Sequence, residues 1–246
     1  MYNVEKSEKW GYIMAKLKAS FLALAGNKWF CLSWLVFGCA YMTIFGLLYV
    51  EDLFTEGLKS VSVLGVLFEP TMTATASIIG KTYFWGFKGW GVFQSISLTL
   101  SVLYVYRRYG FTGKSARAGK ICLIAATCCI LTCIMIRSTE EFGLQLVAHW
   151  SGALLFGVFN AIALGLCLLY GAKGNKRFLA TFVVFVAMLA AMIVLLIVLG
   201  KSGAIESIPM WGAYLILFLL GYTNLYKKSL PALSPAPALE QEAVTV

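Results

Sequence analysis

The side chains best suited to chemistry lie around the single histidine of the sequence, His149. Gln145 comes one helical turn before it, Arg137 and Glu141 stand in the polar stretch upstream, and Asn160 follows eleven residues later. Eleven residues make close to three turns of an α-helix, so His149 and Asn160 are expected on one face. A histidine among such neighbours is suited to binding a ligand or exchanging a proton.

A second polar face is expected on another apolar segment, where Gln94 is followed by Ser97, Ser101 and Tyr104 at helical spacing. Polar side chains at membrane depth usually face the interior of a bundle or a wet cavity. The two faces therefore predict a polar pocket that opens outward between the second and fourth spans. The alternative is a set of interhelical hydrogen bonds that only fixes packing. The candidate ligand-binding residues are His149, Gln94, Asn160, Gln145, Glu141 and Arg137.

Several reaction types find no support in the sequence. One histidine is too few for a multi-histidine metal site or for the paired axial ligands of a b-type haem. The seven cysteines form no C-x-x-C or C-x-x-H spacing, and neither G-x-S-x-G nor a Walker A motif occurs. Ser138, Glu141 and His149 form only a weak triad. We therefore predict no catalytic residue, metal or cofactor, and the sequence does not decide whether the chain is an enzyme.

The composition indicates a membrane protein. Hydrophobic residues make up 60% of the 246-residue chain and charged residues 13%, whereas soluble domains carry about 25% charged residues. The mean hydropathy is +0.82. The net charge of +9 comes from basic clusters between apolar stretches, which is typical of membrane proteins and does not predict a nucleic-acid partner.

Six apolar stretches are long enough to cross a hydrocarbon core of about 30 Å. The predicted fold is an all-α, polytopic six-helix transmembrane bundle over 29–226. It is preceded by a cytoplasmic amphipathic segment over 1–28 and followed by a disordered cytoplasmic tail over 227–246. The predicted spans are 29–50, 89–106, 119–136, 147–170, 178–199 and 208–226.

The distribution of charge predicts that both termini are cytoplasmic. Of the 20 Lys and Arg residues, 15 fall on the side of the N-terminus and five on the other. Trp29 is expected at the inner membrane edge and Trp85 at the outer one. The loop 51–88 is then extracytoplasmic. Within it, 58–80 is moderately apolar, and whether it is re-entrant, luminal or a seventh span stays open.

The fourth span carries a ladder of small residues. Ala153, Gly157, Ala161 and Gly165 recur every four residues after His149. Such a ladder predicts close packing against a neighbouring helix. The partners expected from these features are membrane lipids, a second copy of the chain or another membrane protein.

The chain resembles the six-helix membrane family of damage-regulated autophagy modulators, Frag-type proteins and uncharacterised bacterial relatives. The likeness is carried by a long first outer loop with Ser60-Val61-Ser62-Val63-Leu64-Gly65, which is similar to the family's Ser-Asp-x-Gly-type stretch. It is also carried by His149-Trp150-Ser151-Gly152-Ala153, which is similar to its His-x-x-Gly-Ala run. The family's aspartate is missing near Ser62. The resemblance implies a membrane role without a defined reaction.

Three functional classes are compatible with these features. The leading hypothesis is a multi-pass membrane protein that binds or moves a lipid, small solute or ion through the polar pocket. The alternatives are a membrane enzyme acting on a lipid headgroup through His149, Glu140 and Glu141, and a scaffold or accessory subunit of a membrane complex. The expected location is the cell membrane of a bacterium, or the plasma membrane or an endomembrane of a eukaryote.

Overall fold

The computed structural model describes residues 2–46, 61–63, 66–68, 84–136, 143–199 and 203–226. Apart from one short hairpin, the regular structure there is helical. The helices are α1 (Tyr2–Leu24), α2 (Lys28–Gly46), α4 (Phe84–Arg108), α5 (Gly113–Met135), α6 (Leu144–Ala172), α7 (Lys176–Leu199) and α8 (Gly203–Tyr222). Each of the six predicted span ranges overlaps one of α2 and α4–α8, although 47–50 lies outside the described residues and 223–226 lies beyond the end of α8. The tail 227–246 lies outside the described residues.

The hairpin lies within the predicted outer loop. Its strands β1 (Val61–Val63) and β2 (Val66–Phe68) pair antiparallel, with Ser62 opposite Leu67. The described residues of 58–80 are therefore extended and not helical, which does not fit a helical seventh span through them. The remainder of that stretch lies outside the described residues.

Short turns connect α1 to α2, α4 to α5 and α6 to α7. The Asn27 side-chain oxygen accepts hydrogen bonds from the backbone N–H groups of Trp29 and Phe30, which caps the start of α2. Asn175 accepts one from the backbone N–H of Arg177 at the start of α7. Between α4 and α5, Gly110 has a φ of 57°, a left-handed conformation that glycine adopts without strain.

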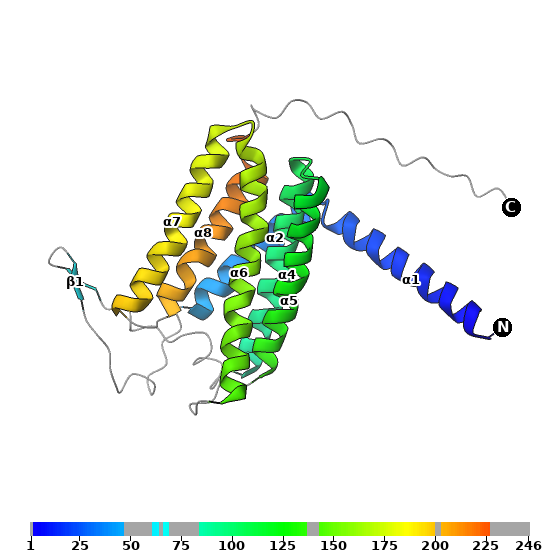
Figure 1. Cartoon of the computed structure of the whole chain (residues 1–246), viewed down its shortest axis with the longest axis horizontal. Coiled ribbons are helices and arrows are strands. Elements are labelled where there is room, and N and C mark those ends of the chain that lie inside the picture. Colours follow the sequence, from blue (N-terminus) through cyan, green and yellow to red (C-terminus); the bar gives the residue numbers. More distant parts are fainter. Residues whose placement is uncertain are drawn as a thin grey trace.

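Figure 1 shows α2 and α4–α8 packed side by side, with α1 projecting away from them. Neighbouring helices pack in the sequence α2, α4, α5, α6, α7, α8, and α8 returns to α2. Helix α4 also contacts α8 and α6, so it has more helical neighbours than any other described helix and lies at the centre. The most polar helix of the bundle is thus its most enclosed one.

Helices α5, α6, α7 and α8 are each long and apolar enough to cross a membrane, which makes this a membrane protein by composition. Within the described part of the chain, α1 and α2 together give a fifth candidate if their bent pair, with an angle of 78°, counts as one span. Helix α7 has only three buried residues, Phe178, Phe185 and Leu199. Its remaining surface is apolar and suits lipid.

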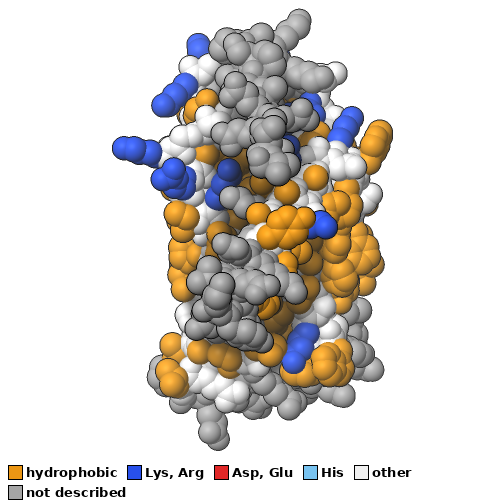
Figure 2. All heavy atoms as spheres, turned by 90° about the vertical axis from the view of Figure 1, so that its right-hand side faces the viewer, with side chains coloured by type: hydrophobic (Ala, Val, Ile, Leu, Met, Phe, Trp, Pro, Cys, Tyr) orange, Lys and Arg blue, Asp and Glu red, His pale blue; other side chains and the backbone are white. Residues whose placement is uncertain are grey.

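Charge is segregated between the two ends of the bundle. In the described part of α2 and α4–α8 with their turns, nine of the ten Lys and Arg residues lie at one end, here called the basic end. They are Lys28, Arg107, Arg108, Lys114, Arg117, Lys120, Lys173, Lys176 and Arg177. Lys88 and the one described acid of these segments, Glu206, lie at the other end. Figure 2 shows the basic side chains gathered toward one end above a band of hydrophobic ones.

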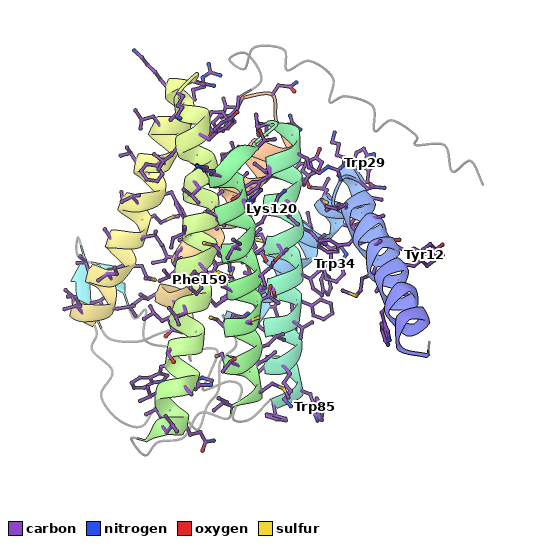
Figure 3. The ribbon with its side chains drawn as sticks, turned by 45° about the vertical axis from the view of Figure 1, so that its right-hand side comes forward. Tyr12, Trp29, Trp34, Trp85, Lys120 and Phe159 are labelled. Carbon is purple, nitrogen blue, oxygen red and sulfur yellow. The ribbon has the colours of Figure 1, made fainter. Side chains whose placement is uncertain are left out.

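Exposed tryptophans mark both ends, as Figure 3 shows for Trp29 and Trp85. Trp29 is 69% exposed at the basic end and Trp85 is 79% exposed at the opposite end. Amphipathic rings in such positions fit the two interfaces of a membrane.

The small-residue ladder of α6 does not form one packing face. Ala153 and Gly157 are exposed, and a Cβ atom added to Gly157 would meet no described atom within 4 Å. No described helix of this chain covers these two positions, so contact with a neighbouring helix stays a prediction there. A four-residue repeat advances about 40° per step on a helix with 3.6 residues per turn, so the ladder drifts around α6. Only its end at Gly165 reaches α7, at Phe182.

Close approach occurs instead at Gly152, where α6 meets α5. A Cβ atom there would lie 2.8 Å from the backbone oxygen of Cys129. Gly152→Ala should therefore lower the free energy of unfolding by about 1–3 kcal/mol, since a backbone atom has to move. Gly157→Ala is the matched control on the same helix and should change stability by less than about 1 kcal/mol. Thermal unfolding of both purified variants measures the difference, and equal midpoints would contradict the described α5–α6 packing.

Candidate functional site

Gln94 is a polar side chain with no exposed surface. Its amide nitrogen donates a hydrogen bond of 2.9 Å to the backbone oxygen of Gly38 in α2. Its amide oxygen accepts one of 2.7 Å from the Tyr214 hydroxyl in α8. One side chain of α4 thereby connects two other helices, and both ends of its amide are paired.

The backbone of α2 approaches α4 closely beside this amide. Ser97, one turn after Gln94, donates a hydrogen bond of 2.8 Å to the backbone oxygen of Trp34. A Cβ atom at Gly38 would clash with Ser97 and would lie 2.6 Å from the Tyr214 hydroxyl oxygen. Glycine at this position is what lets the three helices meet at one level.

Two buried hydroxyl groups, one on α4 and one on α8, have no hydrogen-bond partner in the described chain. Ser101 is 1% exposed, and neither its Oγ nor the hydroxyl oxygen of Tyr222 has a hydrogen-bond partner among the described residues. Helix α8 runs parallel to α4, so a step of two turns from Gln94 and Tyr214 leads to Ser101 and the neighbourhood of Tyr222. Tyr104, one turn after Ser101, stacks on Tyr222 with ring centroids 5.3 Å apart. We call Gln94, Ser97, Ser101, Tyr214 and Tyr222 the polar seam.

The seam ends at the basic end of the bundle. Arg108 donates hydrogen bonds to the backbone oxygens of Gly221 and Thr223, so it holds the end of α8 beside Tyr222. Tyr109 donates one of 2.8 Å to the oxygen of Leu220. Burial raises the pKa of Tyr109, and the charge of Arg108 acts in the opposite direction. The phenol therefore stays protonated and can donate at neutral pH.

His149 belongs to a different site, at the opposite end of the bundle. It is 2% exposed, and its Nδ1 lies 2.9 Å from the backbone oxygen of Cys133 and 2.8 Å from that of Ile136. Carbonyl oxygens only accept, so Nδ1 carries the proton. The histidine thus pairs carbonyl groups at the end of α5, where a helix leaves its last carbonyls without partners. Its ring centroid lies 6.0 Å from that of Phe87 in α4.

The four predicted ligand-binding residues that the structure describes do not share one site. Gln94 hydrogen-bonds to α2 and α8, His149 to the end of α5, and Asn160 donates to Phe156 of its own helix. Gln145 is exposed at the start of α6. Arg137 and Glu141 lie outside the described residues.

Sequence reasoning found the polar face of α4 but missed its partners. Tyr214 and Tyr222 lie within an apolar stretch, and a phenol at that depth requires a partner for its hydroxyl, which was an available signal. Gly38 carried no signal, since one glycine among many does not show where helices meet. Glu206 was also missed, and it lies within electrostatic reach of Cys133 near His149.

The role of His149 at the end of α5 is testable by two substitutions. His149→Leu removes the donor and leaves two carbonyls unpaired, so the free energy of unfolding should fall by about 1–3 kcal/mol. His149→Asn places an amide nitrogen where Nδ1 stands and should retain most of the stability. Chemical unfolding of the purified proteins in detergent measures both. If the two variants are equally stable, the donated hydrogen bonds do not hold α5.

No protein-family model, curated protein or solved structure matches this chain.

Proposed function

We propose that this chain is a multi-pass membrane protein that crosses the membrane six times with both termini in the cytoplasm. We propose further that it binds or moves a small solute, a lipid or an ion through its polar interior. The polar seam between α2, α4 and α8 takes the place of the pocket expected between the second and fourth spans. The observation that carries this proposal is the pair of buried hydroxyls on Ser101 and Tyr222 that have no partner in the described chain.

Burial without a partner is costly for a hydroxyl. An unpaired buried donor or acceptor costs about 1–3 kcal/mol, whereas a ligand that hydrogen-bonds to it recovers that energy. Ser101 lies on the central helix α4, and Tyr222 lies at the end of α8, which packs against α4. A bound group that accepts and donates hydrogen bonds would satisfy both.

The lining favours a neutral ligand over an ion. Every member of the seam is uncharged at neutral pH, and the nearest described cation, Arg108, already donates to backbone oxygens of α8. A bare charge at this depth requires a counter-charge or several strong ligands. We therefore favour a hydroxyl-bearing or amide-bearing solute or headgroup.

A scaffold is the second candidate function. Ala153 and Gly157 present small, exposed residues on α6 that no described part of this chain covers. Helices in membranes associate through such surfaces. A change of oligomer size in detergent after Gly157→Leu would favour this candidate.

The proposed six-span topology is supported by the clustering of Lys and Arg at the basic end. Lys and Arg favour the cytoplasmic side, and the described basic residues gather where α2, α5 and α7 begin and where α4, α6 and α8 end. Reporter fusions after residues 113, 174 and 228 should report the cytoplasm. Fusions after residues 57, 140 and 203 should report the opposite side. A cytoplasmic signal at residue 140 would overturn the count of six spans.

Substituting Ser101 distinguishes a bound ligand from an empty seam. If a ligand pairs with Oγ, Ser101→Ala should lower the thermal midpoint of the protein purified in lipid nanodiscs. If the hydroxyl is unpaired, the same change removes a penalty of about 1–3 kcal/mol and the midpoint should rise. Ser97→Ala is the matched control and should lower the midpoint in either case, because it removes the bond to Trp34.

A density map of the same nanodisc sample gives the second measurement. The proposal expects non-protein density within hydrogen-bonding distance of Ser101 Oγ and the Tyr222 hydroxyl, and its loss in Ser101→Ala. A rise of the thermal midpoint together with a map that lacks this density would overturn the proposal.

A further inference from the structure

Six of the nine cations of the basic end form two groups of three. The side chains of Arg107, Arg108 and Arg177 donate hydrogen bonds to backbone oxygens at the ends of α1 and α8. These three arginines therefore stabilise the fold. The exposed side chains of Lys114, Arg117 and Lys120 have no hydrogen bond or ion pair with any described residue. This second group is available to a partner outside the chain.

The second group lies at the level where a membrane's headgroups meet its hydrocarbon. Lys114, Arg117 and Lys120 follow each other at three-residue steps and lie on about one third of the circumference of α5. One further turn along the helix, Ile121 and Ile124 are 60% and 66% exposed. A surface that changes within two turns from basic to apolar matches a boundary between headgroup and acyl chain.

Helix α1 is joined to the same end of the bundle. Arg107 donates to the backbone oxygen of Leu22, so α1 ends beside the turn that leads from α4 into α5. From there α1 projects away from the other helices (Figures 1 and 3). Trp10, Met14, Leu17 and Phe21 recur at helical spacing along it and are 43–62% exposed. Such an exposed apolar face is stabilised when it is buried at the boundary between lipid headgroups and acyl chains.

We propose that the α5 cations and the apolar face of α1 together dock on anionic lipid headgroups of the leaflet at the basic end. Charge complementarity identifies the occupant. In the described part of the chain the only acids are Glu5 and Glu8 in the first turns of α1 and Glu206 at the opposite end. An anionic leaflet supplies the missing negative charge, and its acyl boundary accepts Leu17 and Phe21.

This inference is independent of the solute or lipid proposed for the polar seam, because no seam residue contributes to the surface. The proposed lipid-binding surface also differs chemically from the polar seam. The seam is buried and neutral, whereas this surface is exposed and positive. Binding here should therefore weaken with salt, as interactions between exposed charges do.

The test uses the full chain purified in a neutral detergent. Thermal unfolding is followed while phosphatidylglycerol or phosphatidylcholine with the same acyl chains is added. We expect phosphatidylglycerol to stabilise the protein more, and 0.5 M salt to remove most of the difference. The triple variant Lys114→Gln, Arg117→Gln, Lys120→Gln should need roughly tenfold more phosphatidylglycerol for half of the effect. Lys88→Gln, at the opposite end, is the matched control and should respond like the wild type.

Hydrogen exchange of α1 in nanodiscs of the two lipids is the second measurement, and it needs no variant. Backbone amides of residues 10–24 should exchange at least about tenfold more slowly in phosphatidylglycerol than in phosphatidylcholine. Equal exchange of α1 in the two lipids would overturn the role of α1. An unchanged phosphatidylglycerol response in the triple variant, or equal stabilisation by both lipids, would overturn the role of the α5 cations.

Discussion

The amide of Gln94 is the interaction on which the arrangement of the bundle depends. Lipid is as apolar as the side chains of a membrane helix, so burial of apolar surface does little to choose neighbours. A buried amide does determine which helices become neighbours, because leaving its donor or its acceptor unpaired costs free energy. Gln94 donates to Gly38 and accepts from Tyr214, which sets α2 and α8 against α4 in one register. Ser97 and the missing side chain of Gly38 then let the backbones approach.

The need to pair buried polar groups explains why α4, the most polar helix of the bundle, is also the central one. Gln94, Ser97 and Ser101 are buried on α4, which contacts four other helices, while the apolar α7 has only three fully buried residues. Tests of length and hydropathy find α7 easily and pass over α4. Hydropathy measures suitability for lipid, and α4 is surrounded largely by protein. The position of α4 therefore follows from hydrogen bonding and not from its mean hydropathy.

The sequence predicted the helices well and their neighbours poorly. The lengths of the apolar stretches gave the helical ranges, and the 3.6-residue period gave the shared face of Gln94, Ser97 and Ser101, because both are properties of one segment. Predicting whether Gln94 and His149 line one pocket required knowing which helix faces pack together. That packing depends on contacts between segments far apart in the chain. The described chain leaves the ladder exposed at Gly157 for a geometric reason, since a four-residue step does not stay on one face. His149 is buried, and its partners are the backbone oxygens of Cys133 and Ile136, which no side-chain pattern reveals.

The end of the seam places a condition on any movement of a solute along it. Tyr104 and Tyr222 are stacked there, and Arg108 holds the end of α8 through the backbone oxygens of Gly221 and Thr223. A solute that reached Ser101 would meet these two rings before it met the basic end. On the proposed function, passage therefore requires the rings to separate, and the bonds from Arg108 oppose a shift of α8 that would separate them. The same arginine that stabilises the fold would then also keep the seam closed at the basic end, whereas a protein that only binds its ligand needs no such movement.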